Sequence, residues 1–262
     1  MNKAVLLSCL LSIPEAVNAS GSAAEYLKAL KVLSEVDSRP AVANVASGFG
    51  ASSGQYFASV SYTDQDTQTM LEGDDDGSII LGFGLGNPQE NFGLELVMGI
   101  TSVSTSMWGD GKFGDEGNLN VKIHRSITPI WSGQAASLSL GASNFYGWGS
   151  TVENPVNTYL AYSEIDYIGN YSQYGLAYTI GYGSAVASGE TSSSFFGGVG
   201  IARSRYGASI SFVDEALHYS MMWYPPFLEN LSVTLSHENN RDIQNSGRNI
   251  LTIGYSFQVK DE

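Results

Sequence analysis

Three consecutive residues, His218, Tyr219 and Ser220, form the most enzyme-like pattern in the sequence. Side chains alternate between the two faces of a strand, so His218 and Ser220 are expected on the same face. A histidine beside a serine can act as the base that activates the hydroxyl as a nucleophile. The plainer interpretation is two ordinary polar residues inside a β-barrel, because Leu217, Tyr219 and Met221 occupy the opposite, apolar face. The pattern favours the plainer interpretation and leaves a hydrolase as the alternative.

Six other ionisable side chains are predicted to line the inside of the same barrel. Their strands alternate small or polar residues with apolar ones, and the polar face of a barrel strand points to the lumen. The set consists of Glu95, Lys122, His124, Glu164, Asp166 and Glu238. Glu164 and Asp166 belong to it because Tyr159, Ile165 and Tyr167 are assigned to the apolar face of that strand. Charges so placed can set the ion preference of a pore or form a network that fills the lumen, and the sequence leaves both open.

Metal and nucleotide sites have little support in the sequence. The three histidines lack the spacing of a zinc motif, and no cysteine is near enough to complete one. The run Asp74-Asp75-Asp76 offers carboxylate oxygens for Ca²⁺, although such a run is more often a solvated loop tip. Alternate glycines at 82–86 lie in a predicted strand with no helix after it, so they lack the context of a phosphate-binding loop. No cofactor is therefore expected.

The predicted last strand, residues 249–259, indicates what kind of element would carry these side chains. One face is apolar and consists of Leu251, Ile253, Tyr255, Phe257 and Val259. The other face is mostly small or polar, as in a strand between lipid and an aqueous lumen. A half-buried strand of a soluble β protein is the alternative.

The spacing Thr252-x-Gly254-x-x-Phe257-x-Val259 resembles the assembly signal on the final strand of outer-membrane β-barrels. The resemblance implies that the barrel-assembly machinery recognises this strand. The pattern departs from the family in its tail, because three charged or polar residues follow where such chains often stop at an aromatic residue.

Period-two alternation recurs between residues 54 and 259 and predicts about twelve antiparallel strands. Long polar connections alternate with short turns along most of this region, as in bacterial barrels with short periplasmic turns and longer outer loops. A soluble sandwich has no reason to separate its connections by length. The prediction is an all-β, up-and-down transmembrane β-barrel with both ends on the periplasmic side.

The first 53 residues differ from the rest. Residues 1–19 have a positive start, a short apolar run and small residues at the end, which predicts a signal peptide. Residues 20–53 lack alternation, and helical spacing predicts a short helix at about 24–36. They are interpreted as a periplasmic segment and a candidate plug of the lumen, followed by the barrel at 54–259.

Composition excludes some partners. The chain has 12 basic and 26 acidic residues and a net charge of −14, which would repel the phosphates of nucleic acid. Its single cysteine, Cys9, lies in the predicted signal, so disulfide chemistry is not expected in the mature chain.

Two further resemblances bear on function. Gly54-Gln55-Tyr56-Phe57, the hairpin at 82–95 and the closing strand resemble barrel proteins of cyanobacterial outer membranes. This resemblance implies a porin-like barrel in contact with lipid in a bacterial outer membrane and brings no activity with it. The order His-Tyr-Ser resembles the motif of outer-membrane lipid A deacylases, but Met221 and Met222 follow where that family has Asn and small residues.

The function expected from these features is a narrow passive channel for small solutes or ions. It would prefer cations if the acidic residues line its path. The alternatives are an outer-membrane lipid hydrolase using Ser220 and His218, and a structural barrel that presents acidic loops to a partner.

Overall fold

The computed structural model describes residues 39–63, 76–101, 113–131, 133–168, 174–184, 193–213, 216–228, 230–239 and 247–259. Twelve strands account for most of these residues. They are β1 (Gln55–Thr63), β2 (Asp76–Gly86), β3 (Gly93–Ile100), β4 (Gly117–Ile127), β5 (Ala135–Trp148), β6 (Asn157–Ile168), β7 (Tyr174–Ser184), β8 (Ser193–Arg203), β9 (Tyr206–Val213), β10 (Ala216–Trp223), β11 (Leu231–Asn239) and β12 (Gly247–Gln258).

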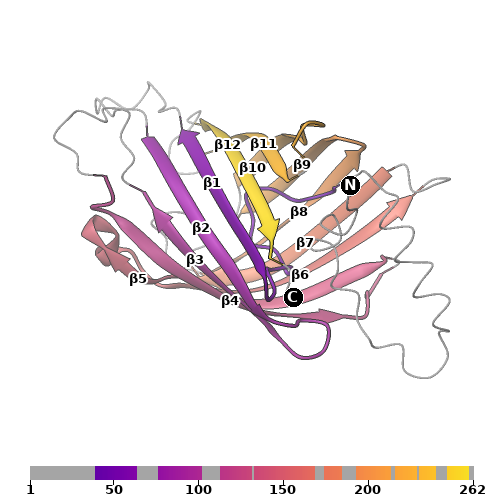
Figure 1. The fold of residues 1–262 in the computed structure, drawn as a ribbon, viewed down its shortest axis with the longest axis horizontal. Coiled ribbons are helices and arrows are strands. Elements are labelled where there is room, and N and C mark those ends of the chain that lie inside the picture. Colours follow the sequence, from indigo (N-terminus) through magenta and orange to yellow (C-terminus); the bar gives the residue numbers. More distant parts are fainter. Residues whose placement is uncertain are drawn as a thin grey trace.

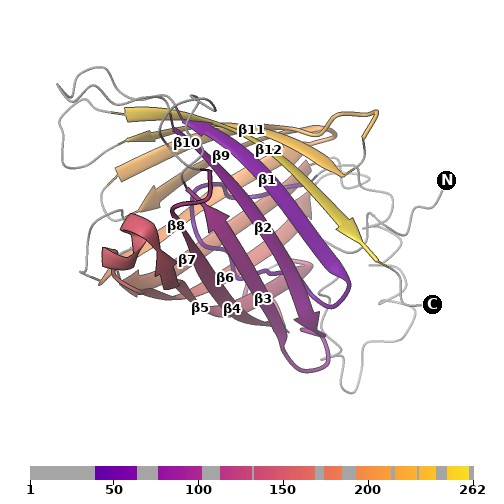
Figure 2. The same ribbon diagram turned by 60° about the vertical axis from the view of Figure 1, so that its left-hand side comes forward.

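The strands form one closed barrel in which each strand pairs with its neighbours in sequence and β12 pairs with β1. Every pairing is antiparallel, and the ribbon closes on itself in both views (Figures 1 and 2). The predicted antiparallel barrel of about twelve strands is therefore confirmed.

Helical structure is scarce in the described part of the chain. Its only helical element is the 3-10 helix η2 (Gly149–Glu153), which lies between β5 and β6. None of the described helices has the length and hydropathy that crossing a membrane requires. The predicted signal at 1–19 and the predicted helix at 24–36 lie outside the described residues.

The two ends of the barrel have different connections. At the end named here the short-turn end, strands are joined by residues 87–92, 128–134, 169–173, 204–205 and 224–230. At the other, long-loop end they are joined by residues 64–75, 101–116, 149–156, 185–192, 214–215 and 240–246. The connection at 214–215 is the exception to the predicted alternation, since it is short. Both β1 and β12 have their free ends at the short-turn end.

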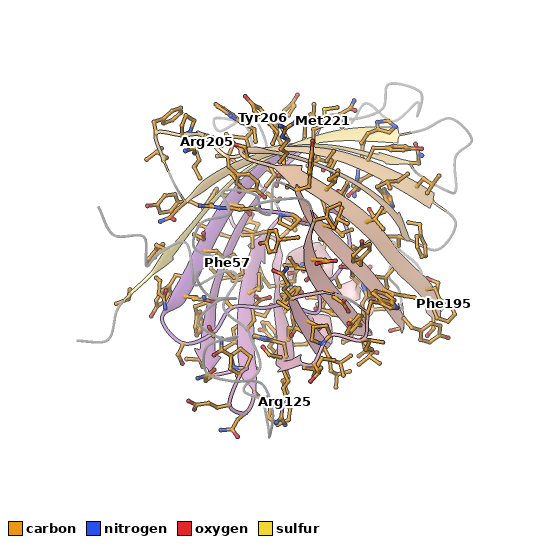
Figure 3. All side chains as sticks on the ribbon, turned by 90° about the vertical axis from the view of Figure 1, so that its right-hand side faces the viewer. Phe57, Arg125, Phe195, Arg205, Tyr206 and Met221 are labelled. Carbon is orange, nitrogen blue, oxygen red and sulfur yellow. The ribbon has the colours of Figure 1, made fainter. Side chains whose placement is uncertain are left out.

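Apolar and polar side chains are inverted relative to a water-soluble protein. On β5, Leu140 points outward and is 60% exposed, whereas Ser139 beside it points inward and is 1% exposed. The same holds on β10, where Met221 is 70% exposed and Ser220 is 4% exposed. Figure 3 shows Met221 and Arg125 at opposite margins of the barrel, and Phe57 lines the cavity within it. The interior is thus a mostly polar lumen, with one small apolar cluster in which Val45 and Ala46 pack against Ala161, Phe196 and Val213.

The seam between β1 and β12 contains the residues of the predicted assembly signal. Thr252 and Gly254 face the lumen, and Phe257 and Val259 are exposed on the outside. The ring of Phe257 stacks on Tyr56 of β1, with 5.2 Å between ring centroids. The pattern therefore lies at the closure of the barrel, although these contacts do not test its recognition by an assembly machinery.

Candidate functional site

Residues 39–54, named here the lumen segment, run inside the ring of strands ahead of β1 (Figure 2). The segment begins at the short-turn end, where the Tyr224 hydroxyl donates to the Arg39 carbonyl over 3.2 Å. It returns to the same end, where the Ser53 amide donates to the Gly86 carbonyl over 2.9 Å. Gly54 then turns the chain into β1 with a φ of 80°, a conformation that glycine adopts without strain.

Serine hydroxyls of the wall bind the backbone of the first half of the segment. Ser209 accepts a hydrogen bond from the Ala43 amide over 3.2 Å, and Ser211 donates to the Ala43 carbonyl over 2.9 Å. The Asn44 amide group donates to Ser220 over 3.3 Å. Because the segment belongs to no sheet, these hydroxyls supply partners that its backbone would otherwise lack.

Two more serines bind the middle of the segment from the opposite wall. Ser163 of β6 accepts from the Gly48 amide over 2.9 Å, and Ser139 of β5 donates to the Ser47 carbonyl over 2.9 Å. The inward serines thus form a polar track that fixes the path of the segment.

A charged cluster from β3 and β4 holds the second half of the segment. The Glu95 carboxylate accepts from the Ala51 amide and pairs with the Lys122 ammonium, both over 2.8 Å. Lys122 also donates to the Phe49 carbonyl, and His124 Nε2 donates to the Ala51 carbonyl, both over 2.9 Å. The carbonyl can only accept, so this contact assigns the proton to Nε2 of His124. Hydrogen bonds to charged groups contribute about 1.5–3 kcal/mol each, so this cluster is the strongest anchor of the segment.

Glycines of the wall give the segment its space. A Cβ atom at Gly84 would overlap the backbone of Ala51, and one at Gly200 would overlap the Ala41 carbonyl. A Cβ at Gly198 would lie 2.7 Å from the Val42 side chain. These small inward residues admit a length of the chain itself.

The rest of the lumen holds a cavity beside the segment. Residues 43–51 form their wall hydrogen bonds with β3–β6, β9 and β10. A cavity of about 440 Å³ lies beside the segment and is bordered by β1, β11 and β12 and also by β6 and β7. Its lining includes Arg39 and Phe49 from the segment and Phe57, Ser232 and Ser256 from the wall. A second cavity of about 240 Å³ lies between Phe49 and Phe257. The lumen is therefore narrowed by the segment and hollow beside it.

The six predicted lumen residues divide into two groups. Glu95, Lys122, His124 and Glu238 point inward, and the first three converge on the lumen segment. Glu238 lies near the long-loop end, where its carboxylate pairs with Arg248 over 2.7 Å. Both inward carboxylates are thus neutralised by a basic partner.

The prediction that Glu164 and Asp166 point inward is wrong. The inward residues of β6 are the odd-numbered ones, because Ser163 binds the lumen segment and pairs in register with Ser137. Tyr159 and Tyr167, assigned to the apolar outer face, accordingly lie inside. The face of β6 that carries Glu164 and Asp166 was predicted to border the aqueous lumen, but it lies on the outside of the barrel.

A turn folded over the outer wall explains how Glu164 is accommodated there. The side chain is fully buried, and its carboxylate accepts from the amides of Ile130 and Trp131, both over 3.1 Å, and of Gly133 over 2.6 Å. The Tyr162 hydroxyl also donates to it. Burying a carboxylate is costly unless such donors surround it. The sequence signal that points to this covering turn is Trp131, a large aromatic residue in the short connection after β4.

His218 and Ser220 both point into the lumen, but Ser220 forms its hydrogen bonds with other residues. Ser220 Oγ lies 3.0 Å from Ser236 Oγ and accepts from Asn44, and no hydrogen bond joins it to His218 among the described residues. The register pairs His218 with Glu238 and with Ser211. A base within hydrogen-bonding reach of the hydroxyl, which a nucleophilic serine needs, is not among these contacts.

The proposed calcium ligands receive no test, because Asp74 and Asp75 lie outside the described residues, as does the side chain of Asp76. In the described part of the chain, no three His, Cys, Asp or Glu side chains gather closely enough to hold a metal ion.

Neither a family model nor a curated protein matches the sequence. In structure, the chain is similar to the KdgM porin, with 12% identity over 77% of this chain and 99% of that one and a TM-score of 0.46. It is similar to the outer membrane protein Omp33 of Acinetobacter baumannii, with 10% identity, 78% and 98% coverage and a TM-score of 0.41. It is also similar to the S-type phycobiliprotein lyase CPES of Guillardia theta, with 7% identity, 79% and 88% coverage and a TM-score of 0.33. All three TM-scores are below 0.5, so the inferences that follow rest on the residues of this barrel.

Proposed function

We propose that this chain is a narrow passive channel in the outer membrane of a bacterium. The observation that carries the proposal is the inverted barrel, with an apolar outside and a polar, partly hollow lumen. The segment that runs through the lumen sets the width of the path.

The outer face supports a membrane environment. Large apolar side chains are exposed on eleven of the twelve strands, all except β3, among them Val60, Leu140, Phe195, Met221 and Leu235. Leaving one such side chain in water forgoes about 1.5–3 kcal/mol, and soluble monomers rarely expose contiguous apolar patches beyond a few hundred Å². Hydrocarbon is the solvent in which this face is stable, and a closed barrel leaves no strand edge unpaired in it.

The connections support an orientation. Short turns face the periplasm and longer loops face outward in bacterial outer-membrane barrels, which assigns the short-turn end to the periplasm. The connections at the long-loop end contain 13 of the 26 acidic residues and only two of the 12 basic ones. The outer mouth is therefore strongly acidic, whereas the connections at the short-turn end are almost free of charge.

The cavity supports a path along β1, β11 and β12. The inward residues of these strands carry hydroxyls at Ser59, Ser61, Ser232, Thr234 and Ser256. Glu238 and Arg248, the inward charges of β11 and β12, pair with each other near the long-loop end. A hydroxyl-lined path exchanges hydrogen bonds with water and small polar solutes without holding them tightly, as conduction requires. The path is bounded on its other side by the lumen segment.

The distribution of charge favours a cation preference that arises at the outer mouth of the barrel. Glu95 and Glu238 are paired with basic residues, so the lumen itself carries little net charge. An acidic mouth raises the local concentration of cations, and salt screens this effect within about 10 Å at 0.1 M. A cation preference that disappears at high salt is therefore expected. Recognition of β12 by the assembly machinery and a cyanobacterial origin stay predictions.

Ion current through a planar bilayer tests the proposal. The full chain should give small, steady conductance steps, and the variant lacking residues 20–53 should give larger ones because the narrowing segment is gone. Absence of current from both proteins, with correct barrel insertion shown by heat-modifiable electrophoresis, would refute the channel. That outcome would favour the structural barrel with acidic loops.

A further inference from the structure

The turn after β4 presents an uncharged apolar tip on the outside of the barrel. Ile130 is 69% exposed and Trp131 is 57% exposed, while their amides are held from beneath by the buried Glu164. The Trp131 ring packs edge-on against Tyr162 and Tyr178, with centroid distances of 5.6 and 5.8 Å. Because the turn lies at the short-turn end and its orientation is fixed, it offers a rigid apolar surface to whatever surrounds the barrel there.

Exposed arginines lie on the outer wall on both sides of this turn. Arg125 on β4 lies over the ring of Phe92 at 5.3 Å, and Arg203 at the end of β8 lies over the ring of Tyr174 at 5.1 Å. Neither arginine forms an ion pair with another described residue. An aromatic ring beneath a guanidinium fixes its position and leaves its N–H donors free for another partner.

These groups together form a surface named here the β4–β8 rim, which consists of Arg125, Ile130, Trp131, Tyr174 and Arg203. Tryptophan and tyrosine in membrane proteins favour the headgroup level of a bilayer. Guanidinium groups match phosphate geometry with paired hydrogen bonds. At the opposite end of the barrel the connections are acidic, so the rim is the face that suits an anion.

We propose that the β4–β8 rim binds the phosphate of anionic phospholipids in the periplasmic leaflet, with Arg125 and Arg203 as the phosphate ligands and Ile130 and Trp131 against the acyl chains. This inference rests on the proposed membrane location and adds a headgroup preference to it. A basic residue near an anionic membrane surface contributes roughly fivefold in binding. Removing both arginines should therefore weaken binding about 25-fold.

The test compares phosphatidylglycerol with phosphatidylcholine of the same acyl chains, retained on the full chain in detergent and counted by native mass spectrometry. The wild type should prefer phosphatidylglycerol, and the double variant Arg125→Gln, Arg203→Gln should lose that preference. Arg248→Gln is the matched control, because Arg248 lies near the acidic end and pairs with Glu238 inside the barrel. It should bind lipid as the wild type does.

Several results would overturn the proposal. An unchanged preference in the double variant excludes these arginines, and equal retention of both lipids by the wild type excludes a headgroup preference. Competition by soluble glycerophosphate at equal phosphate concentration would indicate a site for free phosphate rather than for lipid. If the double variant fails to fold, sodium chloride should still reduce phosphatidylglycerol retention by the wild type while phosphatidylcholine is unaffected; equal sensitivity contradicts the proposal. Failure of the wild type to insert into vesicles would instead refute the membrane location itself.

Discussion

Replacement of Glu95 by alanine should release the lumen segment and widen the path. The change removes the acceptor of the Ala51 amide and the carboxylate partner of Lys122, while the bonds from Lys122 to Phe49 and from His124 to Ala51 remain. A hydrogen bond to a charged group contributes about 1.5–3 kcal/mol, and a loss of about 2 kcal/mol raises the ratio of displaced to docked segment roughly 30-fold. Single-channel recording should therefore show large openings about 30 times as often.

Glu238→Ala is the control, because it also removes an inward carboxylate from an ion pair, with Arg248, but it has no contact with the lumen segment among the described residues. It should leave the frequency of large openings unchanged. Gly200→Val should also displace the lumen segment and increase the frequency of large openings, because the valine side chain would occupy the position of the Ala41 carbonyl. If Glu95→Ala and Gly200→Val both give the wild-type frequency, the segment does not control the path.

Two other predictions follow from the same contacts. Ser220→Ala should leave lipid release by the purified protein unchanged, because Ser220 bonds Ser236 and Asn44 rather than a base; loss of a measurable release would restore the hydrolase. Glu164→Ala should destabilise the barrel by about 3 kcal/mol or more, because three backbone amides lose their acceptor. Each buried amide left without a hydrogen-bond partner costs about 1–3 kcal/mol. Urea unfolding in lipid vesicles measures this loss, with Glu90→Ala at an exposed turn as the control, and equal midpoints for both variants would refute it.

Much of the fold could be predicted because a lipid-facing strand has a period that the sequence displays directly. The last strand shows it clearly, since Leu251, Ile253 and Tyr255 alternate with Thr252 and Gly254 and are exposed on the outside of β12. Alternating lengths of the connections then fixed the direction of each strand. Strand alternation and connection length are both local properties of the sequence, so they can be identified without knowing which strands pair.

The contents of the lumen could not be predicted in the same way. Gly84, Gly198 and Gly200 look alike whether they border water or a length of chain, and only the fold shows that residues 41–51 fill the space beside them. Glu164 was assigned to the wrong face for a related reason. A carboxylate predicts a wet environment, but here amides from a turn more than thirty residues earlier take the place of water.

The lumen segment has a topological consequence. Arg39 and Gly54 both lie at the short-turn end, so the chain between them enters and leaves the barrel through the same end, as a loop. Such a loop can be withdrawn without any chain end passing through the barrel. A fluorophore attached at Arg39 would therefore report each withdrawal from one side of the membrane.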